Sequence, residues 1–254
     1  MIKVGIIGGS GLDDPDILKN ASQITSDTPY GKPSSPLNCG EIGGIEVAIL
    51  ARHGKDHSIF PSKVNYRANI MALKQHGCTH VLAATAVGSL REEIEPGHLV
   101  FPSQFIDFTR KRETTFFDED VVVHTPMAEP FCPRLRDLLA ATAKDADIPY
   151  HPDRTIITIE GPRFSTRAES HMFRSWNADV INMSTVPEVV LAREKQLHYA
   201  AVAMSTDYDC WREGEESVTW EMIVETMRKN AHNVINLFLK TIPQITQYHD
   251  ICLG

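Results

Sequence analysis

The sequence of 254 residues predicts an α/β fold: a central mixed, largely parallel sheet flanked by helices in a three-layer arrangement. Short apolar runs of strand length alternate along the chain with longer segments whose apolar residues have helical spacing. Polar or otherwise special residues follow several of the strand-like runs, at the sheet edge where α/β proteins bind ligands. No repeat, low-complexity segment or linker interrupts this pattern, so we expect one domain over residues 1–254.

Apolar runs of strand length are predicted to form the buried core of the sheet. They are residues 3–8, 45–51, 82–86, 155–159, 179–183 and 200–204. Runs that are apolar throughout, rather than at every second position, are typical of strands covered on both faces.

Helices are predicted at residues 61–76, 133–146, 187–195 and 219–240. Pro61, Pro133 and Pro187 stand at the start of the first three, where the missing N–H of proline costs no hydrogen bond. Gly77 ends the first helix, and the last carries the longest apolar stripe.

Composition excludes several function classes. The net charge is −8 and the basic residues cluster only at 110–112, so no nucleic-acid partner is expected. No apolar run approaches the roughly 20 residues of a membrane span, and the apolar N-terminus is too short for a signal peptide. The five cysteines are odd in number and form no CxxC motif, which indicates reduced thiols and a cytoplasmic protein.

Three strand ends carry groups that suit an anion. Ser10 lies in a glycine-rich turn after the first strand, Arg52 follows the second, and Thr85 lies at the end of the third. A dinucleotide-binding turn, and with it a nicotinamide-dependent oxidoreductase, is an alternative, but Asp14 occupies the third glycine position of that motif and would repel a pyrophosphate. A single inorganic phosphate fits these residues better.

Two carboxylates, Asp207 and Asp209, follow the apolar run at residues 200–204. Such a pair can bind a metal, share a proton or hold a ligand rich in N–H donors. Aspartates at this kind of position also commonly cap backbone N–H groups in a turn. The pair alone does not distinguish these possibilities.

Long motifs make the chain resemble the trimeric purine nucleoside phosphorylase family over nearly its whole length. They are GIIGGSGLDD at residues 5–14, ARHG from Ala51, NYRAN from Asn65, TAVGSLREE from Thr85, HTPMAEPFCP from His124, TIEGPRFSTRAES from Thr158, INMSTVPE from Ile181 and STDYDCW from Ser205. The resemblance implies the single-domain, three-layer phosphorylase fold and a homotrimer with no membrane association.

The resemblance also implies a role for each matching residue. The implied phosphate ligands are Ser10, Arg52, His53, Thr85, Ala86 and Ser184. The implied nucleoside contacts are Met183 at the ribose, Phe164 and Ser165 at the base, Asp207 and Asp209 at the purine N7 and 6-amino edge, and His124 of a neighbouring subunit with Trp220 at the 5′ end.

The implied reaction is phosphorolysis of S-methyl-5′-thioadenosine to adenine and 5-methylthioribose 1-phosphate, a step of purine and methionine salvage. Its sugar passes through an oxocarbenium-like state, and the departing purine needs a proton at N7, for which Asp207 is the predicted general acid. Asp209 would accept from a 6-amino group and disfavour a 6-oxo group. Phosphate is already an anion, so no metal and no cofactor are expected.

The sequence leaves further alternatives open. A purine nucleoside phosphorylase that accepts adenosine or 6-oxo purines would share this fold, although its base-reading position usually holds asparagine where this chain has Asp207. A non-catalytic nucleoside-binding protein is the third alternative. Ser10 replaces the threonine of some relatives, and Trp220 replaces a valine near the 5′ pocket, where it either shapes that pocket or packs in the core.

Overall fold

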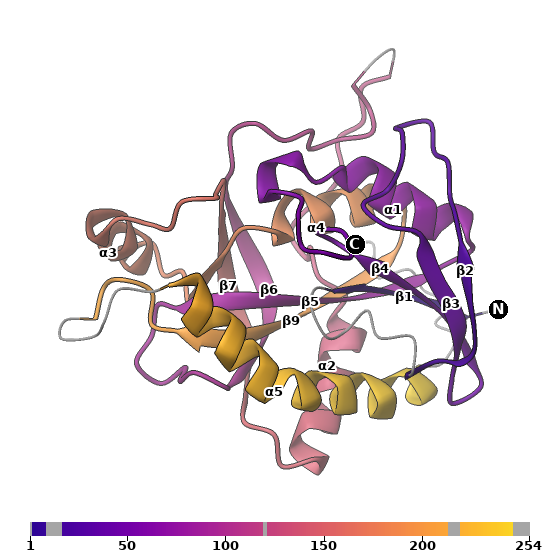
Figure 1. The fold of residues 1–254 in the computed structure, drawn as a ribbon. Coiled ribbons are helices and arrows are strands. Elements are labelled where there is room, and N and C mark those ends of the chain that lie inside the picture. The colour runs from indigo at the N-terminus through magenta and orange to yellow at the C-terminus, as the bar shows by residue number, and fades with distance from the viewer. Residues whose placement is uncertain (1, 9–16, 119–120, 213–218, 246–254) are drawn as a thin grey trace.

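Nine strands form one mixed sheet in the computed structural model, which describes residues 2–8, 17–118, 121–212 and 219–245. The strand order is β2-β3-β4-β1-β5-β8-β7-β6-β9 (Figure 1). The strands are β1 (Lys3–Gly8), β2 (Lys19–Ile24), β3 (Leu37–Ile42), β4 (Ile45–Ala51), β5 (His80–Ser89), β6 (Leu99–Phe108), β7 (Tyr150–Ile159), β8 (Val180–Asn182) and β9 (His198–Asp207). The α-helices are α1 (Tyr66–Gln75), α2 (Pro133–Asp145), α3 (Arg167–Ser175), α4 (Thr185–Glu194) and α5 (Trp220–Thr241).

Part of the sheet closes on itself. Strand β5 pairs with β1 and β9 in parallel and with β8 antiparallel, while β6 pairs with β7 in parallel and with β9 antiparallel. Strands β5, β8, β7, β6 and β9 therefore form a ring, from which β1 to β4 extend as an open wing. The predicted mixed, largely parallel sheet is confirmed, and the ring is an addition to it.

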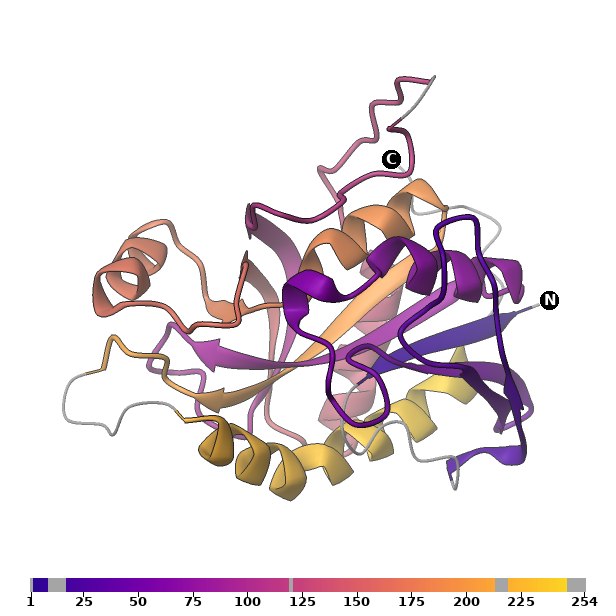
Figure 2. The same ribbon diagram turned by 45° about the horizontal axis from the view of Figure 1, so that its top comes forward.

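Helices cover both faces of the sheet, which confirms the three layers. Helices α1 and α4 lie on one face, and α2 and α5 lie on the other (Figure 1; turned in Figure 2). Ile70 of α1 and Leu191 of α4 belong to one buried cluster, whereas Leu139 of α2 and Leu237 of α5 belong to a second. Each helix thus buries its apolar stripe against the sheet.

The best-predicted elements are those with continuous apolar runs or a clear helical stripe. Strands β1 and β4 have the predicted bounds, and α2 and α5 differ from the prediction by a residue at their ends. The helix predicted at 61–76 is divided: Pro61–Lys63 forms a 3₁₀ turn (η2), and α1 begins after Asn65, whose side chain accepts from the Ala68 N–H.

Sequence patterns missed four elements because none of them buries a regular apolar face. Strand β2 is exposed at every position at the edge of the sheet. Strands β3 and β6 carry interior polar or breaking residues, and β6 changes register at Pro102. Helix α3 is short and polar, buries Ser170 and Phe173, and begins with a capping box between Thr166 and Glu169.

Two strands are longer than predicted, which corrects the placement of one site residue, Asp207. Strand β5 runs from His80 to Ser89, so Thr85 and Ala86, predicted at the end of a strand, lie in its middle. Strand β9 continues through Asp207. Apolarity marked only the buried middle of each strand, whereas pairing between β5 and β9 carries both into the polar region.

A buried histidine pair lies at the start of the same two strands. His80 of β5 is opposite His198 of β9, and their rings stack with centroids 4.7 Å apart. Burial, with a smaller contribution from the charge of His198, lowers the pKa of His80 to about 4. His80 therefore stays neutral in the folded protein at pH values where an unfolded chain would protonate it.

This difference predicts an acid-sensitive stability. As the pH falls from about 6.5 towards 4, the unfolded chain binds a proton that the folded protein does not, so His80 lowers the free energy of unfolding by about 2 kcal/mol between pH 7 and pH 5. His80→Phe retains a stacked ring without a titrating group, so its loss of stability over that range should be smaller by that amount. Urea unfolding at both pH values measures this, with His171→Phe, at an exposed position, as the control. Equal losses in His80→Phe and wild type would contradict the prediction.

Candidate active site

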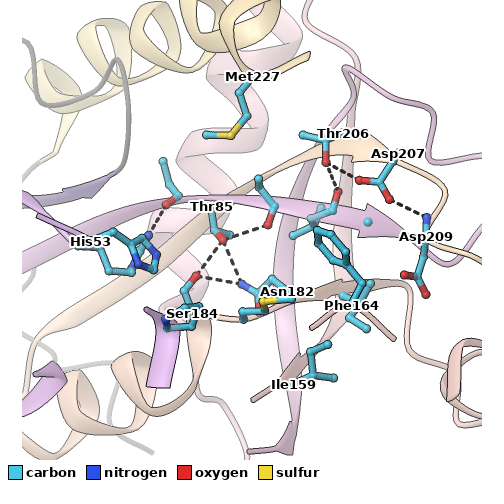
Figure 3. Close-up of a pocket in the computed structure, with 18 of the residues that line it drawn as sticks. His53, Thr85, Ile159, Phe164, Asn182, Ser184, Thr206, Asp207, Asp209 and Met227 are labelled. Atoms are coloured by element: carbon cyan, nitrogen blue, oxygen red, sulfur yellow. Dashed lines mark hydrogen bonds between the residues drawn. The ribbon is translucent and has the colours of Figure 1, made fainter. Parts of the chain in front are cut away.

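One pocket of about 890 Å³, including its open mouth, lies where the sheet divides. Strand β5 pairs with β1 only up to Ala83 and with β8 only from Gly88, so residues 84–87 have a sheet neighbour only on the β9 side. The gap between β1 and β8 is a switch point of the kind at which α/β proteins bind ligands. The pocket contains groups from β5, β7, β8, β9 and α5 and from the residues that follow β4 (Figure 3).

Arg52 supplies a positive charge to the pocket from the end of β4. Its Nε and Nη2 donate to the two carboxylate oxygens of Glu188 at 2.7 and 2.9 Å, and its Nη1 donates to the Ala84 carbonyl at 2.9 Å. Burial alone would lower the pKa of Arg52, but the adjoining Glu188 carboxylate raises it, so the guanidinium stays charged. Three of its five N–H groups are engaged in this way, which leaves one on each Nη for a ligand.

Glu188 is fully buried in α4 and also accepts from the hydroxyl of Tyr199 at 2.8 Å. Its role was not predictable from the sequence, because glutamate on a helix is usually a surface residue. Glu188 occupies the Nε side of the guanidinium, so an anion can be held only by the remaining hydrogens on the two Nη atoms of Arg52.

His53 has a defined tautomer. Its Nδ1 lies 2.9 Å from the Ile59 carbonyl, which can only accept, so Nδ1 carries the hydrogen and Nε2 is an acceptor. Burial and the neighbouring Arg52 lower the pKa of His53 to about 4, so the ring is neutral at physiological pH. His57, four residues on, stands with its ring 4.6 Å from that of His53 and also lines the pocket.

Two hydroxyls complete this end of the pocket. Thr85 Oγ1 and Ser184 Oγ are 3.0 Å apart, and the Asn182 amide donates to Thr85 at 3.1 Å. Ala86, two residues along β5 from Ala84, presents its backbone to the same side of the strand as the carbonyl that meets Arg52. Of the predicted phosphate ligands, the structure brings together Arg52, His53, Thr85, Ala86 and Ser184. Ser10 lies outside the described residues.

Asp207 lies at the opposite end of the pocket, where it is partly exposed. Its Oδ2 accepts from the Thr206 hydroxyl, and its Oδ1 accepts from the Asp209 N–H, both at 2.7 Å. Oδ1 of Asp207 therefore has the backbone-capping role considered from the sequence, while the carboxylate also lines the pocket. The Thr206 hydroxyl also reaches the Val87 carbonyl at 3.2 Å, so it can turn between two acceptors.

A β-bulge sets the position of this carboxylate. The register between β5 and β9 shifts after Val87, so that Gly88 is opposite Asp207. A Cβ at Gly88 would lie 3.0 Å from Asp207 Oδ1 and 3.1 Å from Ile181 Cγ2. The absence of a side chain at Gly88 therefore allows the acid to approach the strand closely.

The remaining predicted base contacts surround Asp209. The Ser165 hydroxyl reaches both of its carboxylate oxygens at 2.7 Å, and Phe164, 40% exposed, lines the adjacent wall. Met183 lies between the two ends and packs tightly on Gly161, where a Cβ would come within 2.5 Å of its sulfur. Phe164, Ser165 and Met183 all line the pocket.

Other lining residues were not predicted as site residues. Met227 projects from α5 toward Thr85 (Figure 3), and its place on the apolar stripe of that helix is indistinguishable in the sequence from a core position. Asn182, Thr206 and His57 were equally unmarked. Asn182 and Thr206 each stand next to a predicted residue, and that adjacency is the one signal that could have found them.

Two predicted residues are not seen at the pocket. His124 is exposed on the segment that follows β6 and does not line it. Trp220 begins α5, but its side chain lies outside the described part of the structure.

Among the described residues, no group of histidine, cysteine, aspartate or glutamate side chains has the arrangement of a metal site. Within the same residues, no helix is both long and apolar enough to cross a membrane. The described cysteines Cys39, Cys78, Cys132 and Cys210 form no disulfide with one another.

Comparison with known proteins shows what this geometry is similar to. The chain is 55% identical over 251 residues to the S-methyl-5′-thioadenosine phosphorylase of Danio rerio, covering 97% of this chain and 90% of the relative. It superposes with a TM-score of 0.92 and 44% identity on the methylthioadenosine phosphorylase of Schistosoma mansoni in complex with adenine, covering 96% of this chain and 92% of that one. A variant of the adenosine/methylthioadenosine phosphorylase of the same organism, in complex with methylthioadenosine, gives a TM-score of 0.91 at 43% identity, covering 96% and 91%.

The family model described as the phosphorylase superfamily matches residues 3–243, which include every described strand and all five α-helices. A match of that extent, together with relatives more than half identical over nearly the whole chain, agrees with the resemblance in the sequence motifs. The chain belongs to the phosphorylase superfamily.

Proposed function

We propose that this protein catalyses the phosphorolysis of S-methyl-5′-thioadenosine to adenine and 5-methylthioribose 1-phosphate. The observation that carries the proposal is a single pocket with a guanidinium and hydroxyls at one end and a pair of carboxylates at the other. Relatives more than half identical bear the name of this activity. Such an enzyme is a pentosyltransferase of purine and methionine salvage.

Phosphate binds at the Arg52 end. The two remaining Nη hydrogens of Arg52 and the hydroxyls of Thr85 and Ser184 supply donors to its oxygens, with the Ala86 N–H and Ser10 as further ligands. Neutral His53 has an acceptor at Nε2, which suits the O–H of hydrogen phosphate. Bound in this way, phosphate attacks the anomeric carbon as the C–N bond breaks. The nucleophile carries its own charge, so no cofactor or metal is part of the proposed chemistry.

The purine binds at the acid end. Asp207 delivers a proton to N7 as the base leaves, and the Thr206 hydroxyl turns between Asp207 and the Val87 carbonyl as the carboxyl changes its protonation state. Asp209, held by Ser165, accepts from the 6-amino group, while Phe164 covers the base and Met183 the ribose. Membership of the phosphorylase superfamily leaves no support for the oxidoreductase alternative.

The active site is shared between subunits of a homotrimer in this proposal. Val121, Val122 and Val123 precede His124 and are 59%, 82% and 42% exposed, an unusual run of exposed apolar residues. Figure 2 shows the chain on both sides of residues 119–120 standing away from the body of the molecule. We expect this segment to pack on a neighbouring subunit and to bring His124 over the 5′ end of its substrate.

Three further parts of the prediction remain proposals. Trp220 shapes the 5′ pocket: it lies two helical turns before Met227, on the same face of α5, and Met227 lines the pocket. Residues 1–254 form one domain, supported by the single sheet that joins strands from both ends of the chain. The protein acts in the cytoplasm, which accords with thiols that form no disulfide among the described cysteines.

The first test is phosphate dependence. Removing Arg52 alone would leave Glu188 buried without its partner, which destabilises proteins by about 3–5 kcal/mol. The double variant Arg52→Met with Glu188→Gln avoids that charge. It should raise the KM for phosphate and lower adenine release by about 100-fold or more. The double variant Arg110→Met with Glu113→Gln, which makes the same two changes at exposed positions, is the matched control. Equally fast release of adenine by the wild type in phosphate-free buffer would refute phosphorolysis.

A second test concerns base choice. Asp207→Asn removes the proton donor for N7 and presents an amide that can donate to a 6-oxo group. Cleavage of methylthioadenosine should fall sharply, and its ratio to cleavage of methylthioinosine should shift by about 10-fold or more. Initial rates with both nucleosides measure this, and Asp137→Asn on the exposed side of α2 is the matched control. An unchanged ratio would show that Asp207 does not read the base.

The shared site is tested by Val122→Asp. A charge on this exposed side chain should not disturb the folded subunit, but it should weaken packing between subunits. Light scattering should show a trimer for wild type and smaller species for the variant, with activity reduced at low protein concentration and restored as the concentration rises. A fully active monomer would contradict the shared site.

A further inference from the structure

The side chain of Asn182 connects hydroxyl groups from several elements beneath the Arg52 end of the pocket (Figure 3). Asn182 is the last residue of β8 and is 5% exposed. Its Nδ2 donates to Thr185 Oγ1 at 2.7 Å and to Thr85 Oγ1 at 3.1 Å, with a longer contact to Ser184 Oγ at 3.4 Å. Its Oδ1 accepts from the buried Thr158 hydroxyl of β7 at 2.9 Å. The amide is therefore held in one orientation by partners on both sides.

This orientation decides what the two pocket hydroxyls can offer a ligand. A hydroxyl has one hydrogen to donate and two lone pairs that accept. The two Asn182 N–H groups donate to Thr185 and Thr85, so the Thr85 hydrogen is not needed for the bond to Asn182. Ser184 Oγ lies 3.0 Å from Thr85 Oγ1, so its hydrogen can donate to Thr85. The Thr85 hydrogen reaches the Ala86 carbonyl at 3.2 Å, a long bond that an anionic acceptor would replace with a stronger one.

We propose that Asn182 is a positioning residue for the phosphate co-substrate: its amide donates to the Thr85 oxygen and so leaves the Thr85 hydrogen for phosphate. The inference rests on the proposed phosphorolysis. A carboxylate of the same shape would accept the Thr85 hydrogen and would add a negative charge beside the anion. The amide at position 182 thus lets this end of the pocket donate hydrogen bonds to an anion. It does so without a second positive charge next to the Arg52–Glu188 pair.

The test is Asn182→Asp, which changes polarity with almost no change of shape. Its KM for phosphate should rise by about 30-fold or more, in line with the loss of charge-assisted hydrogen bonds. Its KM for methylthioadenosine should stay within about 3-fold of wild type, because the acid end of the pocket is untouched. Calorimetric titration with adenine, in the absence of phosphate, should give an unchanged affinity and shows that the variant is folded.

Thr158→Val is the matched control. It alters the same buried network from the Oδ1 side and leaves the Nδ2 contacts in place, so its KM for phosphate should change far less than that of Asn182→Asp. If the Asp variant does not fold, Asn182→Ala replaces it. Its KM for phosphate should rise by about 10-fold, while its KM for methylthioadenosine should again change little.

Three outcomes would overturn the positioning role: an unchanged phosphate KM, equal rises in the KM values for phosphate and nucleoside, or an equal effect of Thr158→Val. Adenine release by wild type without phosphate would instead refute the proposed function, so the two failures are distinguishable.

Discussion

The buried ion pair between Arg52 and Glu188 is the interaction on which one end of the site depends. It connects the end of β4 to α4, and its further bonds to Ala84 and Tyr199 reach β5 and β9. Two charges can be buried in this way only because they neutralise each other and nearly every polar atom has a partner. The mutual attraction of the two charges and their hydrogen bonds offset the free-energy cost of removing them from water. Arg52 therefore keeps two unengaged Nη hydrogens for an anion, although no unpaired charge is buried.

The rest of the pocket follows from keeping opposite polarities apart. Hydrogen-bond donors surround the Arg52 end of the pocket, and the carboxylates of Asp207 and Asp209 lie at the other end. Between the two ends lies the segment of β5 that pairs with neither β1 nor β8. That division of the sheet exposes strand backbone to a ligand, and the bulge at Gly88 turns Asp207 into the same space. A nucleoside placed between the ends has its base at an acid and its sugar near an anionic nucleophile, as phosphorolysis requires.

Much of the fold was predictable because long apolar runs and helical stripes report burial directly. Strands β1 and β4 and helices α2 and α5 show this. Edge strand β2, which buries nothing, and the short helix α3, which a side-chain cap starts, gave no such signal. Of the site, the charged and hydroxylic residues at the predicted strand ends were foreseen. Glu188, Asn182 and Met227 were not, since in sequence they resemble a surface glutamate, a polar residue within a strand and a core methionine.

By itself, the sequence determined the α/β class and the family, and it predicted which side chains would hold an anion or protonate a purine, because these depend on residue type and local order. Only the tertiary structure decided how those groups act. It paired Arg52 with Glu188, fixed the tautomer of His53 through Ile59, and oriented the Asn182 amide toward Thr85. Each of these contacts joins residues that the fold brings together. The direction of a hydrogen bond depends on which partner lies opposite, and a local pattern of residues does not contain that information.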